Sequence, residues 1–140
     1  MSIAAESRNE VVQLHAFFVE WFNATIEATD GVFSRVESAL HHDFSMVLPS
    51  GSTIDRRSVL GQIRSAHGSA DGERPSRIEI VDLVTHVDGA DAALVSYEER
   101  QFAGDVLQNR RTSSAYFVAA PDAPSGVQWR RLHETLLRED

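Results

Sequence analysis

Three charged residues in the C-terminal half of the chain have the types and spacing for acid/base chemistry: Glu99, Arg111 and Glu134. Each lies in a segment that alternates with a two-residue period, as in a strand with one buried face. An arginine held between two carboxylates keeps one of them ionised and lets the other take a raised pKa, which suits a general acid/base pair. The same residues could instead anchor a ligand or form a structural ion network, and the sequence leaves all three interpretations open.

The spacing of the turns predicts that these side chains meet. A three-residue loop at positions 104–106 pairs Glu99 with Arg111, and a loop near 120–127 leaves Glu134 diagonal to Arg111 on the same face. Directly opposed side chains lie about 5 Å apart and diagonal ones about 7 to 8 Å, so one arginine could bridge two carboxylates. We therefore predict a cluster of these three residues on one sheet face.

Other kinds of chemistry are excluded or disfavoured by composition. The absence of cysteine excludes disulfides, thiolate metal sites and a cysteine nucleophile, and the Gly-x-Ser-x-Gly and phosphate-binding glycine patterns are missing. A net charge of −8 without a basic run argues against nucleic acid and anionic membranes as partners. His41-His42-Asp43 could bind a metal, but we place it at a helix end, where histidines favour the C-terminal dipole. We expect no metal and no cofactor.

The pattern of the first 70 residues predicts helices with one short strand. Ser7 to Glu10 has the capping-box form and starts an amphipathic helix that Asp30-Gly31 ends. A second helix capped by Asp30 should finish near His41-His42, followed by a strand at 44–48. Asp55 then caps a third helix, which ends before Gly68.

After Ser76 the period becomes two, and turn signals at Asp88-Gly89, Gly104-Asp105 and 121–126 divide the rest into four strands. Helices followed by an antiparallel meander predict an α+β fold, with a bulge near Ile80-Val81 where the alternation changes parity. The 140 residues should form one domain, 1–140. We find no signal peptide or membrane span in the sequence and expect a cytoplasmic protein.

This element order, the segment 43–51, the Arg110-Arg111 strand and the ending at 129–134 resemble the nuclear transport factor 2-like (NTF2-like) superfamily. Within it, the chain is most similar to SnoaL-like proteins and to the association domain of calcium/calmodulin-dependent kinase. The resemblance implies a cystatin-like fold, with N-terminal helices on a curved, mainly antiparallel sheet that forms a cone-shaped pocket. It also implies a homodimer. The superfamily includes isomerases, dehydratases, cyclases, epoxide hydrolases, transport factors and oligomerisation modules.

Aligned with the kinase domain, the sequence places Tyr97, Glu99 and Gln101 inward on one strand and Arg111 and Ser113 inward on the next. The same alignment puts His67 at the pocket mouth. The residues predicted to contact a ligand are Trp21, Phe44, Met46, Ile63, His67, Tyr97, Ser113, Phe117 and Leu132.

We therefore predict a protein that binds a small apolar molecule, either as a cofactor-independent isomerase, cyclase, dehydratase or hydrolase, or without catalysis. The alternative is a homo-oligomeric association module. Phe102, Tyr116 and Trp129 have the parity of the outer sheet face, and an aromatic face of this kind predicts that a homodimer forms through it.

Overall fold

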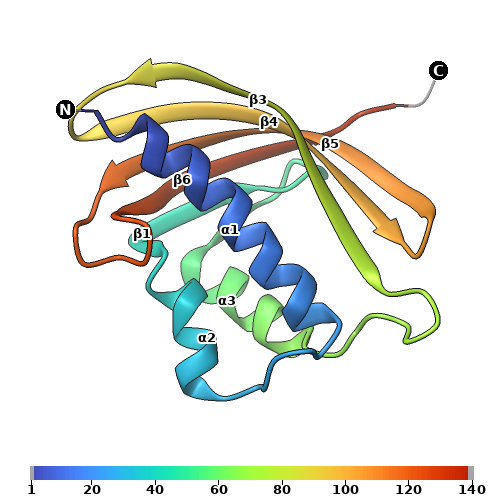
Figure 1. Cartoon of the computed structure of the whole chain (residues 1–140). Coiled ribbons are helices and arrows are strands. Elements are labelled where there is room, and N and C mark those ends of the chain that lie inside the picture. Colours follow the sequence, from blue (N-terminus) through green and yellow to red (C-terminus); the bar gives the residue numbers. More distant parts are fainter. Residues whose placement is uncertain (1, 139–140) are drawn as a thin grey trace.

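The computed structural model describes residues 2–138 and consists of three helices packed against one face of a curved six-stranded sheet (Figure 1). The helices are α1 (Ala4–Phe22), α2 (Asp30–Glu37) and α3 (Arg56–Ser65). The strands are β1 (Leu40–Val47), β2 (Thr53–Asp55), β3 (Ser76–Asp88), β4 (Ala92–Ala103), β5 (Val106–Ala119) and β6 (Val127–Leu136).

The sheet has the strand order β2-β1-β6-β5-β4-β3. Strands β3 to β6 form the predicted antiparallel meander, whereas β1 adds to its far side parallel to β6. In Figure 1, α1 runs along the inner face of the curved sheet, with α2 and α3 beyond it. This arrangement confirms the predicted α+β fold class with a mainly antiparallel sheet.

The N-terminal ends of the first two helices differ from the prediction. α1 begins at Ala4, because the fully buried Ser7 donates its hydroxyl back to the Ile3 carbonyl at 2.7 Å and does not cap a helix. α2 is capped by Thr29, whose side chain accepts from the Val32 amide. The capping box at Ser7 and the Asp30 cap were therefore wrong, whereas the Asp55 cap of α3 is confirmed by its bond from the Ser58 amide.

The segment from Leu40 to Asp43 lies on β1, so its predicted place at the end of the second helix was wrong. The helix stops at Glu37, and the Ala39 carbonyl then accepts a 2.9 Å hydrogen bond from the Trp129 amide. That bond fixes the start of β1 beside β6. Continued apolar spacing through Leu40 had favoured a longer helix, but pairing with the sheet prevails.

The predicted registers of the meander are confirmed. Glu99 is opposite Arg111, and Ser113 is opposite both Tyr97 and Glu134. The loop between β4 and β5 is one residue shorter than predicted, and a bulge next to the turn restores the same pairing. The bulge predicted near Ile80-Val81 lies just beyond it, where the register of β3 shifts.

A bulge in β6 corrects the expected outer face of the sheet. Trp129 pairs with Phe117 and Arg131 pairs with Tyr116, so Arg130 is the extra residue between them. One extra residue reverses the parity of the strand before it. Trp129 is consequently buried on the inner face and takes no part in the outer surface, to which the sequence had assigned it.

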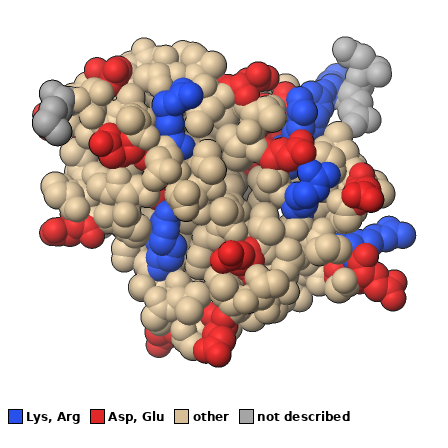
Figure 2. Space-filling view, viewed as in Figure 1, with Lys and Arg blue, Asp and Glu red and all other residues tan. Residues whose placement is uncertain are grey.

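The core fills the space between α1, α2 and the inner sheet face, with Trp21, Phe33, Phe117 and Trp129 among its largest buried side chains. None of the helices within residues 2–138 is long and apolar enough to cross a membrane. On the face displayed in Figure 2, acidic and basic side chains are interspersed over an otherwise uncharged surface.

Candidate functional site

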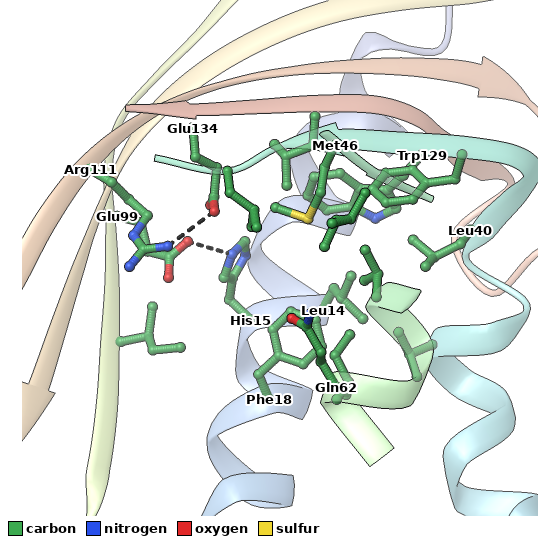
Figure 3. Close-up of a pocket in the computed structure, with 18 of the residues that line it drawn as sticks. Leu14, His15, Phe18, Leu40, Met46, Gln62, Glu99, Arg111, Trp129 and Glu134 are labelled. Carbon is green, nitrogen blue, oxygen red and sulfur yellow. Dashed lines mark hydrogen bonds and ion pairs between the residues drawn. The ribbon is translucent and has the colours of Figure 1, made fainter. Parts of the chain in front are cut away.

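A pocket of about 230 Å³ lies between the helices and the inner face of the sheet (Figure 3). Most of its lining is apolar and comes from α1, α2, α3, β1 with the residue that follows it, β2, β3 and β6: Leu14, Phe18, Phe22, Val36, Leu40, Phe44, Met46, Leu48, Ile54, Val59, Ile63, Ile78, Trp129 and Leu132. The polar lining residues are His15, Gln62, Glu99, Gln101, Arg111 and Glu134. In Figure 3, Glu99, Arg111 and Glu134 gather at one side of the pocket, with Met46, Leu40 and Trp129 at the other.

The structure brings together many of the residues that the sequence proposed. All three members of the predicted charged cluster line the pocket. So do four of the nine predicted ligand contacts: Phe44, Met46, Ile63 and Leu132. Their shared inward orientation follows from the alternation of strands β1, β4, β5 and β6 and from the buried stripe of α3.

The other five predicted contacts lie outside the lining. Trp21 and His67 pack edge to face at 4.6 Å, and each is bonded to a backbone carbonyl, of Ile63 and Ile26 respectively. These bonds hold both rings in the helical layer.

Tyr97, Ser113 and Phe117 do face inward, but they form a fully buried layer behind the pocket wall. Within the described residues, the Tyr97 hydroxyl has no hydrogen-bond partner of acceptable geometry, although Ser113 is close enough to lower its pKa slightly. Burial, followed by the negative charges of Glu99 and Glu134, raises the pKa of Tyr97 well above 10.

His15 is the main site residue that sequence reasoning missed. It lies on α1, is 6% exposed, and bonds through Nε2 to Glu99 Oε1 at 3.0 Å. Its Nδ1 lies 2.6 Å from the Val11 carbonyl, which can only accept, so Nδ1 carries a proton. The one available signal was a polar residue within the apolar stripe of the first helix.

Arg111 does not bridge the two carboxylates as predicted. Its Nη1 donates to Glu134 Oε1 at 3.0 Å, whereas its Nε and Nη2 donate to the Asn109 side chain. Glu99 is instead held by His15 at one oxygen and by Gln101 Nε2 at the other, at 2.5 Å. The cluster is therefore a chain of contacts rather than a single bridge.

The electrostatics favour an ion pair between His15 and Glu99. Burial alone would lower the pKa of His15, but the hydrogen bond and charge of Glu99 outweigh burial and raise that pKa. Burial alone would raise the pKa of Glu99, but the hydrogen bond and charge of His15, helped by Gln101 and Arg111, bring it below its ordinary value. Each partner thus stabilises the charged form of the other.

Glu134 has the opposite tendency. Burial and then the negative charge of Glu99 raise its pKa, and Arg111 offsets the shift only in part. Among residues 2–138, its Oε2 is contacted only weakly, by the Ser113 hydroxyl at 3.5 Å. Two carboxylates on one wall therefore differ in both proton affinity and free hydrogen-bonding capacity, an arrangement suited to acid/base chemistry.

The His41-His42-Asp43 triplet lies on β1, apart from the pocket lining. Its possible ligand atoms are within 4.8 Å of one another, and His42 Nε2 is 3.2 Å from Asp43 Oδ2. His41 Nδ1 already accepts from the Asp43 amide, and the Asp43 carbonyl accepts from Arg130. The absence of a metal site stays a prediction.

Residues 7–138 match the family described as sucrose-6-phosphate phosphohydrolase C-terminal. The chain belongs to this family. No curated protein matches this family member. Solved structures confirm its NTF2-like fold: an NTF2-like protein of unknown function from Pseudomonas aeruginosa is 25% identical, with a TM-score of 0.80 over 95% of this chain and 99% of that chain.

Two other solved structures share the fold of this family member at lower identity. The hub of calcium/calmodulin-dependent kinase II from S. rosetta is 11% identical, with a TM-score of 0.66 over 97% of this chain and 96% of that one. A candidate dehydratase of the NTF2-like family from Streptomyces avermitilis is 18% identical, with a TM-score of 0.65 over 95% and 97% of the two chains.

Proposed function

We propose that this NTF2-like protein binds a small, largely apolar molecule in the pocket and transfers a proton on it without a cofactor, as an isomerase or dehydratase does. The observation that carries the proposal is the unequal pair of carboxylates, Glu99 and Glu134, on one wall of an otherwise apolar pocket. Proton transfer requires a group whose pKa is shifted toward the working pH and that faces the substrate.

The size and polarity of the pocket limit the substrate. Its volume of about 230 Å³ is below the roughly 300–1,000 Å³ of pockets for drug-sized ligands, so the substrate is small. Apolar lining surrounds most of the space, whereas the charged residues gather at one side (Figure 3). We infer an apolar ring or chain with a carbonyl or hydroxyl group directed at the charged side.

Glu134 is the proposed acid/base residue. It lines the pocket, its pKa is raised, and its Oε2 has only a long contact to Ser113, so this oxygen can exchange a proton with a bound molecule. Glu99 is less suited to that task, because both of its oxygens are already occupied.

Arg111 is the proposed stabiliser of negative charge on the substrate. The guanidinium has five N–H donors, of which Asn109 and Glu134 take three. The remaining two can bind a carbonyl oxygen as it gains charge when Glu134 removes the neighbouring proton. The His15–Glu99 ion pair, whose two charges cancel, keeps the wall around these groups fixed.

The family name refers to a phosphohydrolase, and we do not propose a phosphate ester as the substrate of this pocket. A phosphate monoester would place its negative charges beside two carboxylates and a single arginine. The NTF2-like relative described as a candidate dehydratase is closer to the chemistry that these residues support.

The proposal can be tested by deuterium exchange. Small ketones such as cyclohexanone and acetophenone are incubated with the protein in D₂O, and loss of the α-proton signal is followed by NMR. We expect faster loss than in buffer for at least one ketone, no acceleration by Glu134→Gln, and unchanged acceleration by Glu98→Gln, which alters the outer sheet face. Absence of acceleration by the wild-type protein across the panel would overturn the proposed proton transfer.

A second candidate function, self-association, is favoured by the outer sheet face. Val84, Val87 and Tyr116 lie on that face and are 46%, 50% and 40% exposed. Exposed apolar groups gathered on a sheet face are typical of contact surfaces. We propose a homodimer through this face, and the kinase hub among the structural relatives is in line with it.

A further inference from the structure

We propose that Gln101 and Asn109 are positioning residues that relay the positive charge of Arg111 to Glu99, so that a single guanidinium serves both carboxylates of the pocket. The inference rests on the proposed function, because the division of roles between Glu99 and Glu134 depends on it. Both amide side chains extend from a paired stretch of β4 and β5.

The relay is a continuous series of hydrogen bonds. Arg111 donates to Asn109 Oδ1 from Nε at 3.3 Å and from Nη2 at 3.1 Å. Asn109 Nδ2 donates to Gln101 Oε1 at 3.1 Å, and Gln101 Nε2 donates to Glu99 Oε2 at 2.5 Å. Every donor in the series points toward Glu99.

Chemistry fixes the direction of both amides. A guanidinium can only donate, so the oxygen of Asn109 must face Arg111 and its NH₂ group must face Gln101. The Gln101 oxygen then accepts, which leaves its NH₂ group for the carboxylate of Glu99. Both amide dipoles are therefore aligned with their positive ends toward Glu99, and such aligned bonds strengthen one another in a low-dielectric setting.

The strand register builds this row. Glu99 is opposite Arg111 and Gln101 is opposite Asn109, so the four side chains occupy two adjacent cross-strand pairs on the inner face. Arg111 turns toward Glu134 on β6 and bonds to it directly. The amide pair therefore provides the hydrogen-bonded connection between Arg111 and Glu99.

Four other charged or titratable groups act on Glu99 or its neighbours: His15 from α1, Tyr97 from β4, Arg111 from β5 and Glu134 from β6. His15 bonds to one Glu99 oxygen, and the relay bonds to the other. Without the relay, that second oxygen would be buried with no donor. Glu99 would then bind a proton more readily and would resemble Glu134.

The test is an NMR titration of the protein labelled with ¹³C at glutamate side chains, in the ligand-free state. Gln101→Met breaks the last bond of the relay, and Asn109→Leu breaks its middle bond together with the bonds that Asn109 accepts from Arg111. Gln108→Leu is a matched control on the exposed face of β5. We expect the titration midpoint of Glu99 to move upward in both relay variants and to stay unchanged in the control.

An unchanged Glu99 midpoint in Gln101→Met would overturn the relay, and so would an equal shift of Glu99 and Glu134 in both variants. If Asn109→Leu does not fold, an unchanged Glu99 midpoint in Gln101→Met still overturns the relay, since that variant leaves the partners of Arg111 in place. The titration needs no substrate. A failed relay is therefore distinguishable from a failed proton transfer, which the ketone exchange measures separately.

Discussion

The two faces of the central sheet carry the same kinds of charged residue, but these residues differ in their partners and in their exposure to solvent. Glu98 and Glu99 are neighbours in sequence and point to opposite faces. On the outer face, Glu98 pairs with Arg100 at 2.5 Å and Arg110 at 3.4 Å, and the arginine side chains are 37% and 30% exposed. On the inner face, the side chains of His15, Glu99, Arg111 and Glu134 are between 5% and 18% exposed.

The difference between the faces shows that burial and the number of nearby cations together set the pKa of a carboxylate. On the outer face one carboxylate has two arginines, and the Arg100 hydrogen bond lowers the pKa of Glu98. On the inner face two carboxylates share one arginine and one histidine in a largely buried setting, so Glu99 and Glu134 shift in opposite directions. On the outer face, solvent and two arginines around one carboxylate give an ordinary surface ion pair. On the inner face, burial makes the pKa of each carboxylate depend on its own partners.

The largest expected effect is the loss of stability in Arg111→Ala. Removing this cation leaves two buried carboxylates close together, which should cost about 3–5 kcal/mol of unfolding free energy. The matched outer variant, Arg110→Ala, should cost less than about 1 kcal/mol. Urea unfolding near neutral pH measures both values.

The loss in Arg111→Ala should also depend on pH. It should shrink in acid, because Glu134 takes up a proton and the repulsion disappears. An Arg111→Ala protein as stable as the wild type between pH 6 and 8 would mean that these side chains do not interact as described.

His15→Gln should have an intermediate effect that changes with pH. Because the folded-state pKa of His15 is raised above 6.5, its contribution is fully present below about pH 6.5 and is lost as the pH rises through the folded-state value. The gap in unfolding free energy between wild type and variant should therefore narrow from pH 6 to pH 9. A gap that is constant or widens over this range would exclude the ion pair with Glu99.

Glu99→Gln should separate function from stability. Glutamine keeps the shape and can still bond to a neutral His15, so the melting temperature should change by only a few degrees. If the charge of Glu99 serves function by raising the pKa of Glu134, exchange of ketone protons should slow in Glu99→Gln, whereas Glu98→Gln should retain it. Parallel loss of stability and exchange in Glu99→Gln would favour a purely structural network.

The smallest effect on stability is expected for Tyr116→Lys. Surface substitutions usually change the unfolding free energy by less than about 0.5 kcal/mol, and Tyr116 is 40% exposed. Its effect on assembly should be large, because each protomer of the proposed dimer would place one new positive charge in an apolar contact surface. Light scattering should give a dimer mass for wild type and a monomer mass for the variant, and a wild-type monomer at micromolar concentration would remove the dimer.

Much of the sheet was predictable, because turn signals and strand alternation act locally. The pairing of Glu99 with Arg111 followed from the position of the Gly104 turn, and the inward direction of Glu134 followed from the next loop. The bulge at Arg130 was not predictable, because one extra residue leaves no mark on the alternation of neighbouring residues. It moved Trp129 from the expected outer face into the core.

The site was only half predictable. Strand parity brings the three charged residues to one face, but the rotation of α1 against the sheet decides whether His15 reaches Glu99. A single histidine in an apolar helix stripe is more often a core residue, and nothing local distinguishes the two cases. The hydrogen bond from Arg111 to Asn109 could not be predicted either. The rotamer of a side chain on paired strands depends on all of its neighbours at once.

The central claim is that the partners of each carboxylate separate the titration of Glu134 from that of Glu98 and Glu99, and one titration tests it directly. In wild-type protein labelled with ¹³C at glutamate side chains, Glu134 should titrate above the ordinary value of 4.5, and Glu98 and Glu99 should titrate below it. Glu134 titrating together with Glu98, at or below that value, would contradict the claim.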